Sequence, residues 1–305
     1  MIDDINRYKT FAVAAECKSV SETAKKLFIS QPSVSAELSA LENELNMRLF
    51  FRSNRGITLT EEGKVLYEYI KNAFSFIEKG EEKLREISGL KSGTLRIGAS
   101  DMTLKFFLLD YITEFRDLYP EVRLTVTNNP TPKTLDSLRS GEIDFGVVSE
   151  PFSIANQEEF VLIPVKTIND IFIVKSNSEL AKEKNITRKR LSELPLIMLE
   201  RHTSTRSYVS SYLGADFPSP IIELATSDLL LDFAEKGIGV SSIVEDFALD
   251  SLKSGKTVKL DLCEGVPPRR FFLAYLRRIP MSVAAQRMIS LIEAKNNYTE
   301  KKVII

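Results

Sequence analysis

The sequence predicts an α/β protein built from three successive parts, and three patterns support this prediction. Between residues 20 and 45, apolar residues recur every three or four positions, which is the period of short amphipathic helices. From residue 60 to 90 a heptad spacing continues without a proline, which indicates one long helix. From residue 94 onward, short apolar strands alternate with helices. The expected boundaries are 1–59, 60–90 and 91–305, the last divided into about 91–161 plus 268–305 and about 162–267.

Length, charge and cysteine content exclude several classes of protein. A chain of 305 residues suggests two or three domains. The net charge is only −1, and residues 1–60 carry eight Lys or Arg against seven Asp or Glu, so charge gives no general attraction to nucleic acid. No apolar run approaches a membrane span and no signal-peptide core is present, so a cytoplasmic protein is expected. Cys17 and Cys263 are far apart, which argues against a disulfide framework or a metal cluster, and no cofactor is expected.

Residues 19–45 predict two short helices joined by a turn. Ser19 is suited to cap the first helix, with Glu22 three residues later as in a capping box. Ser30 is suited to cap the second helix, and Pro32 falls in its first turn, where the missing N–H matters little.

The second helix has one apolar face, and small or polar residues lie on or near the opposite side. The apolar residues are Val34, Leu38, Leu41 and Leu45. Small outward side chains let a helix enter the DNA major groove, where Gln can make two hydrogen bonds to adenine. An ordinary helical hairpin has the same apolar spacing, so this pattern alone leaves both interpretations open. The outward candidates are Gln31, Pro32, Ser33, Ser35, Ala36 and Ser39.

A basic hairpin is predicted directly after this helix pair. Residues 52–56 read as its tip, with Arg52 and Arg55 on it, and Ile57-Thr58-Leu59 returns as a strand. A basic β-wing beside a recognition helix would contact the DNA backbone and fix register. Alone, the hairpin would be a solvated turn; beside the helix pair, the wing is favoured.

Residues 5–63 resemble the N-terminal winged helix-turn-helix of the LysR-type transcriptional regulators. The matching elements are Phe11, Ala24, Leu27, SQPSVS from Ser30 to Ser35, Leu41-Glu42, LF and Arg52 in RLFFR, and LTEEG from Leu59 to Gly63. The chain differs from the family at Ala36, where a basic residue is frequent, and at Asn46, where glycine is frequent. The resemblance implies a regulator, not an enzyme, that binds double-stranded DNA at an inverted-repeat operator.

The long helix predicts a homodimer. Thr60 is a good N-cap, and Glu61 and Glu62 suit the positive end of the helix dipole. A helix of this length with one apolar stripe needs a partner helix, so we expect a coiled coil between two chains; packing on its own domain is the alternative. The family resemblance adds the expectation of a homotetramer. The predicted seam residues are Leu66, Ile70, Ala73, Ile77 and Leu84.

The C-terminal region predicts two α/β halves. Strands at 94–100, 122–128 and 143–149, with helices at 104–119 and 131–140, form a βαβαβ unit with a parallel sheet. FVLIPV, DIFIVK, LPLIMLE, PIIEL and GIGVSSI would form a second set, with helices from about Ser204 and over 227–236. The strand 269–278 and a helix 282–294 are expected to return to the first half. This layout, with SGEIDFGVV and EKGIGVSSI, resembles the periplasmic-binding-protein-like effector domain of the same family.

Hydroxyl residues recur where the predicted strands end and helices begin. Ligands of open α/β folds bind at that edge, and hydroxyls with helix N-terminal N–H groups suit a small organic or inorganic anion. Each hydroxyl taken singly is more simply a helix cap. Arg206 could add a charge-assisted bond. The only histidine, His202, could make binding pH-sensitive or could lie on a surface loop. The candidate effector residues are Ser100, Thr103, Thr131, Ser149, His202, Thr203 and Ser204.

The sequence leaves two alternatives to an effector-responsive regulator. A cytoplasmic ligand-binding α/β enzyme fits poorly, because a lone histidine without a G-x-S-x-G motif or a P-loop leaves no assembled chemistry. A redox-responsive regulator would use Cys263, but Asp261 and Glu264 beside it do not favour a reactive thiolate.

Overall fold

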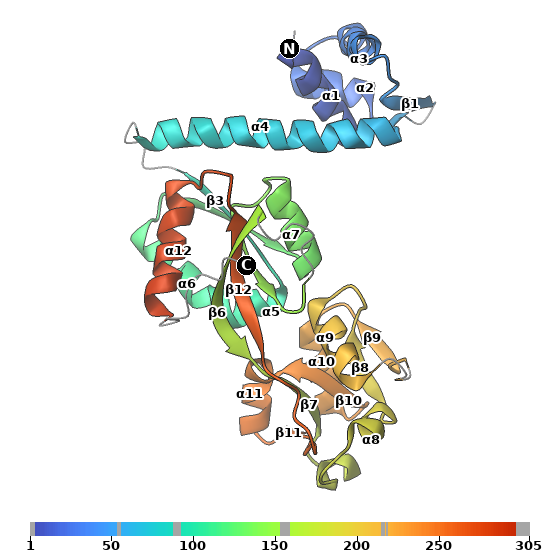
Figure 1. Ribbon diagram of the computed structural model, residues 1–305, viewed down its shortest axis with the longest axis vertical. Coiled ribbons are helices and arrows are strands. Elements are labelled where there is room, and N and C mark those ends of the chain that lie inside the picture. The colour runs from blue at the N-terminus through green and yellow to red at the C-terminus, as the bar shows by residue number, and fades with distance from the viewer. Residues whose placement is uncertain are drawn as a thin grey trace. The chain divides into compact units, whose positions relative to one another are not determined.

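The computed structural model describes residues 4–53, 56–87, 93–152, 159–214, 217 and 219–296 (Figure 1). The chain divides into two compact units, Met1–Glu81 and Glu82–Ile305. In the part of the chain that is described, no helix is both long and apolar enough to cross a bilayer.

The N-terminal unit is a three-helix core with a two-stranded wing and the start of a long helix. The predicted apolar face is confirmed, since Val34, Leu38 and Leu41 are buried against Phe11 and Phe50. Burial of one face is what holds such short helices in place, because isolated helices of this length are marginal in water. The elements are α1 (Ile5–Cys17), α2 (Val20–Leu27), α3 (Gln31–Leu45), β1 (Phe50–Ser53), β2 (Gly56–Leu59) and α4 (Glu61–Ile87).

The predicted helix caps are confirmed. Ser19 Oγ accepts from the Glu22 N–H at 3.3 Å, and Ser30 Oγ accepts from the Ser33 N–H at 3.2 Å. Thr60 Oγ1 accepts from the Gly63 N–H at 3.0 Å and so caps α4. Each cap satisfies one of the donors that a helix start leaves without an intrahelical partner.

Glu42 attaches the wing to α3. Its Oε1 accepts from the backbone N–H of Leu49 at 2.8 Å and of Phe50 at 3.1 Å. At the far side of the hairpin, the Ile57 N–H donates to the Lys18 carbonyl at 3.0 Å. Gly56, with φ +123°, is required here, because a Cβ at this position would lie 2.4 Å from the Lys18 oxygen.

The first sheet of the C-terminal unit has five strands in the order β4-β3-β5-β12-β6. The predicted parallel pairing is confirmed, since β3 pairs in parallel with β4 and β5. The late strand β12 lies antiparallel between β5 and β6, which confirms its predicted return to the first half. The strands are β3 (Thr94–Ala99), β4 (Arg123–Asn128), β5 (Phe145–Ser149), β6 (Phe160–Ile168) and β12 (Arg269–Leu276).

Helices pack on this sheet from three parts of the chain. Helix α12 packs against α6 and β3, and α7 packs against β5 (Figure 1). The helical segment after β3 contains a π-helical stretch, Leu104–Leu108, between α5 and α6. The helices are α5 (Asp101–Thr103), α6 (Leu109–Leu118), α7 (Thr131–Arg139) and α12 (Val283–Lys295).

The second sheet also has five strands, in the order β11-β7-β10-β8-β9. Strand β10 pairs in parallel with β8 and antiparallel with β7. The strands are β7 (Asp170–Lys175), β8 (Leu196–Leu199), β9 (Ile222–Leu224), β10 (Val240–Val244) and β11 (Thr257–Lys259). The helices are the 3₁₀ turn Glu179–Lys182, α8 (Arg188–Ser192), α9 (Ser204–Leu213), α10 (Ser227–Lys236) and α11 (Glu245–Lys253).

One predicted boundary is wrong. Residues 162–168 were assigned to the second half, but β6 runs from Phe160 to Ile168 and pairs with β12 in the first sheet. The chain crosses between the sheets at Asn169, directly before β7. An apolar run indicates a buried strand but not the sheet that it joins, so the sequence could not place this crossing.

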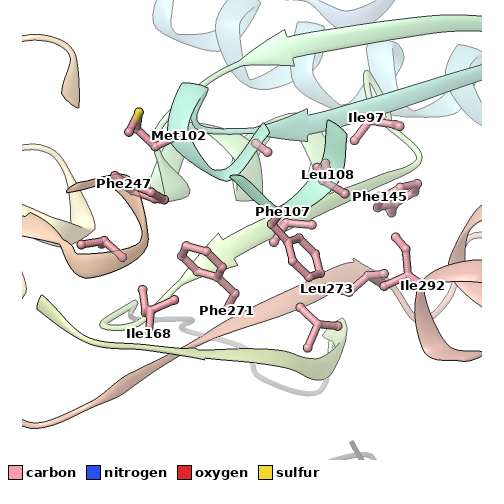
Figure 2. Packing of buried hydrophobic residues seen from close by; sticks show 14 of the residues in the cluster. Ile97, Met102, Phe107, Leu108, Phe145, Ile168, Phe247, Phe271, Leu273 and Ile292 are labelled. Carbon is pink, nitrogen blue, oxygen red and sulfur yellow. The ribbon is translucent and has the colours of Figure 1, made fainter. Parts of the chain in front are cut away.

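The main core of the C-terminal unit is continuous across both sheets (Figure 2). Phe107 packs against the first sheet, where its ring lies 6.3 Å from that of Phe271 on β12. Leu273 of the same strand belongs to the same cluster. Phe247 of α11 belongs to the same cluster, and its ring stacks on Phe106 at 4.6 Å. The two sheets therefore share one hydrophobic cluster, and the cleft between them has a packed floor.

Candidate functional sites

The N-terminal end of α3 is the most exposed part of the helix-turn-helix. Residues 28–33 are all exposed, and this run includes the predicted residues Gln31, Pro32 and Ser33. Ala36 is also exposed, whereas Ser35 and Ser39 are half-buried. The arrangement leaves a small, polar helix start open to a partner, as a recognition helix requires.

Arg52 is committed to α3 in the free chain. Its Nη2 lies 3.4 Å from both Ser39 Oγ and Glu42 Oε2, and its side chain is 49% exposed. Glu42 is only 15% exposed, but both contacts of Arg52 are long and its own side chain is half-exposed, so a phosphate can compete for this arginine. Arg55, the other predicted wing residue, lies outside the described residues.

Lys25 and Lys26 extend the exposed surface at the end of α2. A hydrogen bond from Lys25 to Glu22 raises the pKa of the Lys25 ammonium, and a bond to Glu16 does the same for the pKa of Lys26. Both ammonium groups therefore stay charged at neutral pH, and they lie on α2, which packs against α3.

Helix α4 has two apolar faces rather than the single predicted stripe. Ile70 is 9% exposed and Leu66 packs against the N-terminal core, so these two predicted seam residues are covered by their own chain. Ala73, Ile77 and Leu84 are exposed as a seam requires. Other large exposed apolar residues on this helix are Val65 at 61%, Tyr69 at 72% and Phe76 at 43%.

All seven predicted effector residues line one cavity between the two sheets of the C-terminal unit. Ser100, Thr103, Thr131 and Ser149 come from the first sheet and its helices, whereas His202, Thr203 and Ser204 come from the second. The cavity volume is about 100 Å³, which suits a molecule of a few non-hydrogen atoms. Sequence analysis missed Thr205, Thr226 and Ser227, which add three hydroxyls to the lining.

Three helices of nine or ten residues, α7, α9 and α10, begin at this cavity. Helix α9 is capped by Thr203, whose Oγ1 accepts from the Arg206 N–H at 3.2 Å. No side chain caps α7 or α10 within the described chain. Their first N–H groups carry the positive end of the helix dipole and are suited to an anion.

The cavity hydroxyls divide into bonded and unbonded groups. Thr131 Oγ1 accepts from the Ser149 N–H at 3.1 Å, and Ser100 Oγ accepts from the Thr103 N–H at 3.4 Å. Among the residues that the structure describes, none hydrogen-bonds the hydroxyl of Ser149 or Ser204, although Ser204 is only 6% exposed. These two hydroxyls can therefore bond a ligand without breaking a contact of the protein.

Among the described residues, Arg269 is the one arginine in the cavity lining, and the sequence did not predict it. The side chain is 2% exposed, with Nε and Nη2 donating to both oxygens of Asp170 at 2.5 and 2.9 Å. Nη1 donates to the Glu150 carbonyl at 2.8 Å, and Nη2 also donates to Thr205 Oγ1 at 2.9 Å. Asp170 already neutralises this cation, and Asp101 also lines the cavity, so the features that favour an anion here are the helix N-termini and the hydroxyls.

The predicted candidates Arg206 and His202 differ in whether they reach the cavity. Arg206 does not line the cavity; it is 5% exposed and donates to Glu223 Oε1 and the Leu199 carbonyl, both at 3.0 Å. The role expected for it in ligand binding is therefore wrong, because the guanidinium is used inside the second half of the fold. His202 lines the cavity with a 63% exposed side chain, 3.5 Å from Glu200 Oε2.

Cys263 is exposed, and its Sγ donates to the Asn185 carbonyl at 2.8 Å. No group of three or more His, Cys, Asp or Glu in the described chain is arranged to hold a metal ion.

Family models match both units of the chain. The model described as "Bacterial regulatory helix-turn-helix protein, lysR family" matches residues 5–64. The model described as "LysR substrate binding domain" matches residues 88–296.

Individual relatives agree with these matches. The HTH-type transcriptional activator CmpR of Synechocystis sp. is 27% identical over 296 residues, which are 95% of each chain. The crystal structure of full-length CbnR with its target DNA superposes with a TM-score of 0.66 at 15% identity, covering 95% of this chain and 99% of that one. The Synechocystis CcmR regulatory domain in complex with 2-PG has a TM-score of 0.60 at 22% identity, covering 68% of this chain and 99% of the other.

Proposed function

This chain belongs to the LysR family of transcriptional regulators, and from that membership we propose that α3 reads an operator while the C-terminal cavity binds a small anion. The observation that carries the anion proposal is the meeting of three helix N-termini with several hydroxyls at one cavity, among them the unbonded hydroxyls of Ser149 and Ser204. CbnR, which was solved with its target DNA, and the CcmR regulatory domain, which was solved in complex with 2-PG, support the two parts of this proposal.

The operator contacts follow from the exposed end of α3. Gln31 projects into the major groove and pairs with adenine, while Pro32, Ser33, Ser35, Ala36 and Ser39 let the helix approach. Arg52 exchanges Glu42 for a backbone phosphate, and Arg55, which the sequence predicts in the hairpin turn, is proposed to contact a phosphate as well.

The proposed assembly is a homodimer that binds an inverted repeat. Helix α4 offers exposed small or apolar surface for a second copy, at Val65, Tyr69, Ala73, Phe76, Ile77 and Leu84. A two-fold dimer presents two recognition helices to two half-sites, so operator symmetry mirrors protein symmetry. Family resemblance extends this to a homotetramer, acting in the cytoplasm where its DNA lies.

The effector proposal is tested by thermal unfolding with inorganic sulfate, inorganic phosphate and short mono- and dicarboxylates. A true ligand at a hundredfold excess over its Kd stabilises by about 2.7 kcal/mol, a rise in Tm of about 5 °C or more. Ser149→Ala and Ser204→Ala should each weaken affinity about tenfold by removing one bond to a charged ligand.

The matched control is Ser207→Ala, an exposed serine on α9 outside the cavity, which should leave affinity unchanged. If all three variants respond alike, the stabilising anion binds elsewhere.

A further inference from the structure

Phe28 has an unusual conformation for its residue type. It is the C-cap of α2 with φ 57° and ψ 39°, the left-handed region that bulky residues rarely adopt. Its side chain is 96% exposed, the highest value among the large apolar residues of the described chain. The position therefore combines backbone strain with an apolar ring in water.

No contact within the described fold offsets the backbone strain or the exposure of the ring to water. Phe28 is not part of the N-terminal hydrophobic cluster, and no ring contact recorded among the described residues involves it. The C-caps of α1 and α3 have the same left-handed backbone but polar side chains, Lys18 at φ 53° and Asn46 at φ 51°. Asn tolerates this region well, so a polar residue at position 28 would serve the turn better.

The ring lies at the start of the surface assigned to DNA. Residues 28–33 are exposed without interruption, from Phe28 to the first turn of α3. On the other side, Lys25 and Lys26 have exposed side chains in ion pairs that are easily exchanged for phosphates. In the order of the chain, Phe28 therefore lies between two exposed lysines and the exposed start of α3.

We propose that Phe28 is a DNA-contact residue that packs its ring against an apolar group of the operator at the edge of the major groove. The inference rests on the proposed reading of DNA by α3. Two parts of a duplex offer such a group, the 5-methyl of thymine and the carbons of deoxyribose. Contact with either removes the ring from water, which the free chain does not achieve.

The test uses the full-length protein and a duplex that the wild type itself selects from a random pool. Phe28→Asn should melt at the same temperature or higher, because Asn relieves the strained backbone. It should bind the selected duplex on the order of tenfold more weakly, the loss of one apolar contact. Phe28→Tyr keeps the ring and should stay within about twofold of the wild type.

Two controls separate this contact from general effects. Met47→Ser removes an exposed apolar side chain beyond the other end of α3 and should not change affinity. Replacing each thymine by uracil in turn distinguishes the two sources. If one uracil weakens binding of the wild type, and Phe28→Asn causes no further loss on that duplex, the ring contacts the thymine methyl. A loss on Phe28→Asn that is the same for every uracil duplex identifies the sugar.

Unchanged DNA affinity in Phe28→Asn overturns the proposal, and the ring would then serve a protein partner instead. Gln31→Ala separates this proposal from the wider one. If Gln31→Ala lowers DNA affinity and Phe28→Asn does not, the proposed reading of DNA by α3 still stands. A wild type that selects no duplex overturns both.

Discussion

Arg269 is the residue on which both crossings of the C-terminal unit depend. It opens β12, the second crossing strand, and its guanidinium is paired with Asp170, which opens β7 after the first crossing. It also bonds the Glu150 carbonyl at the end of β5 and Thr205 at the start of α9. One buried cation therefore contacts both halves of the fold and the cavity wall.

Removing that cation should destabilise the C-terminal unit strongly. Arg269→Met leaves Asp170 buried without its partner, and breaking a buried pair in this way costs about 3–5 kcal/mol. Arg270→Met is the matched control, because Arg270 pairs with Glu150 at 39% and 30% exposure and such a pair contributes about 0–1 kcal/mol. Urea unfolding followed by circular dichroism measures both, and equal losses would refute the central role of Arg269.

The sequence predicted the hydroxyls of the cavity but not Arg269, and the reason is physical. Hydroxyls such as Ser100 and Thr203 follow strand ends, and the edge of an α/β sheet brings such positions together whatever the details of packing. The Arg269–Asp170 pair joins positions 99 residues apart, and no local pattern records it. Arg206 is the opposite case: the sequence predicts a ligand contact because this arginine lies at the start of a helix. In the structure its guanidinium instead donates to Glu223.

At the scale of the element, α4 shows how one heptad pattern can serve two surfaces. Tyr69 and Ile70 are neighbours in the chain, yet Tyr69 is 72% exposed and Ile70 is 9% exposed. The 3.6-residue period places Leu66 and Ile70 on the face toward α1–α3, and Val65, Tyr69 and Phe76 on another. The sequence predicted the helix and its length, but spacing alone could not say which stripe the chain covers itself.

This pair of neighbours gives a test of the dimer. Tyr69→Lys places a charge on the exposed face and should convert the dimer to monomers without changing the stability of the N-terminal unit. Ile70→Lys buries a charge in the chain's own core and should destabilise that unit by several kcal/mol.

Sedimentation velocity and thermal unfolding distinguish the two effects. A Tyr69→Lys protein that remains dimeric would place the partner on another surface.

At the scale of the whole molecule, the balance of charge limits how DNA binding depends on salt. Several cations of the N-terminal unit are already paired, among them Arg7 with Glu44, Lys25 with Glu22, Lys26 with Glu16 and Arg52 with Glu42. Among the described residues of this unit that are exposed, Lys9, Lys18 and Arg48 have no recorded ion pair.

Operator binding should therefore fall less steeply with salt than for strongly basic regulators. Arg52 and Arg55 of each chain, which are proposed to contact the DNA backbone, give about four phosphate contacts for a dimer and a log–log slope of about −4. Fluorescence anisotropy between 50 and 300 mM salt measures it. Arg52→Gln should make the slope shallower by about 2 in the dimer, whereas Lys189→Gln in the C-terminal unit should not change it. A slope near −10 would mean that the paired lysines also release counterions.

The position of β12 has a consequence for how the protein is made on the ribosome. Strands β5 and β6 are separated in the first sheet by β12, which is translated about a hundred residues after β6. The second sheet is formed entirely by residues between 170 and 259, so its strands emerge before the first sheet can close. The N-terminal unit, synthesised first, is free to fold earlier still. A polypeptide truncated before residue 269 would therefore contain the whole helix-turn-helix but an incomplete first sheet in the C-terminal unit.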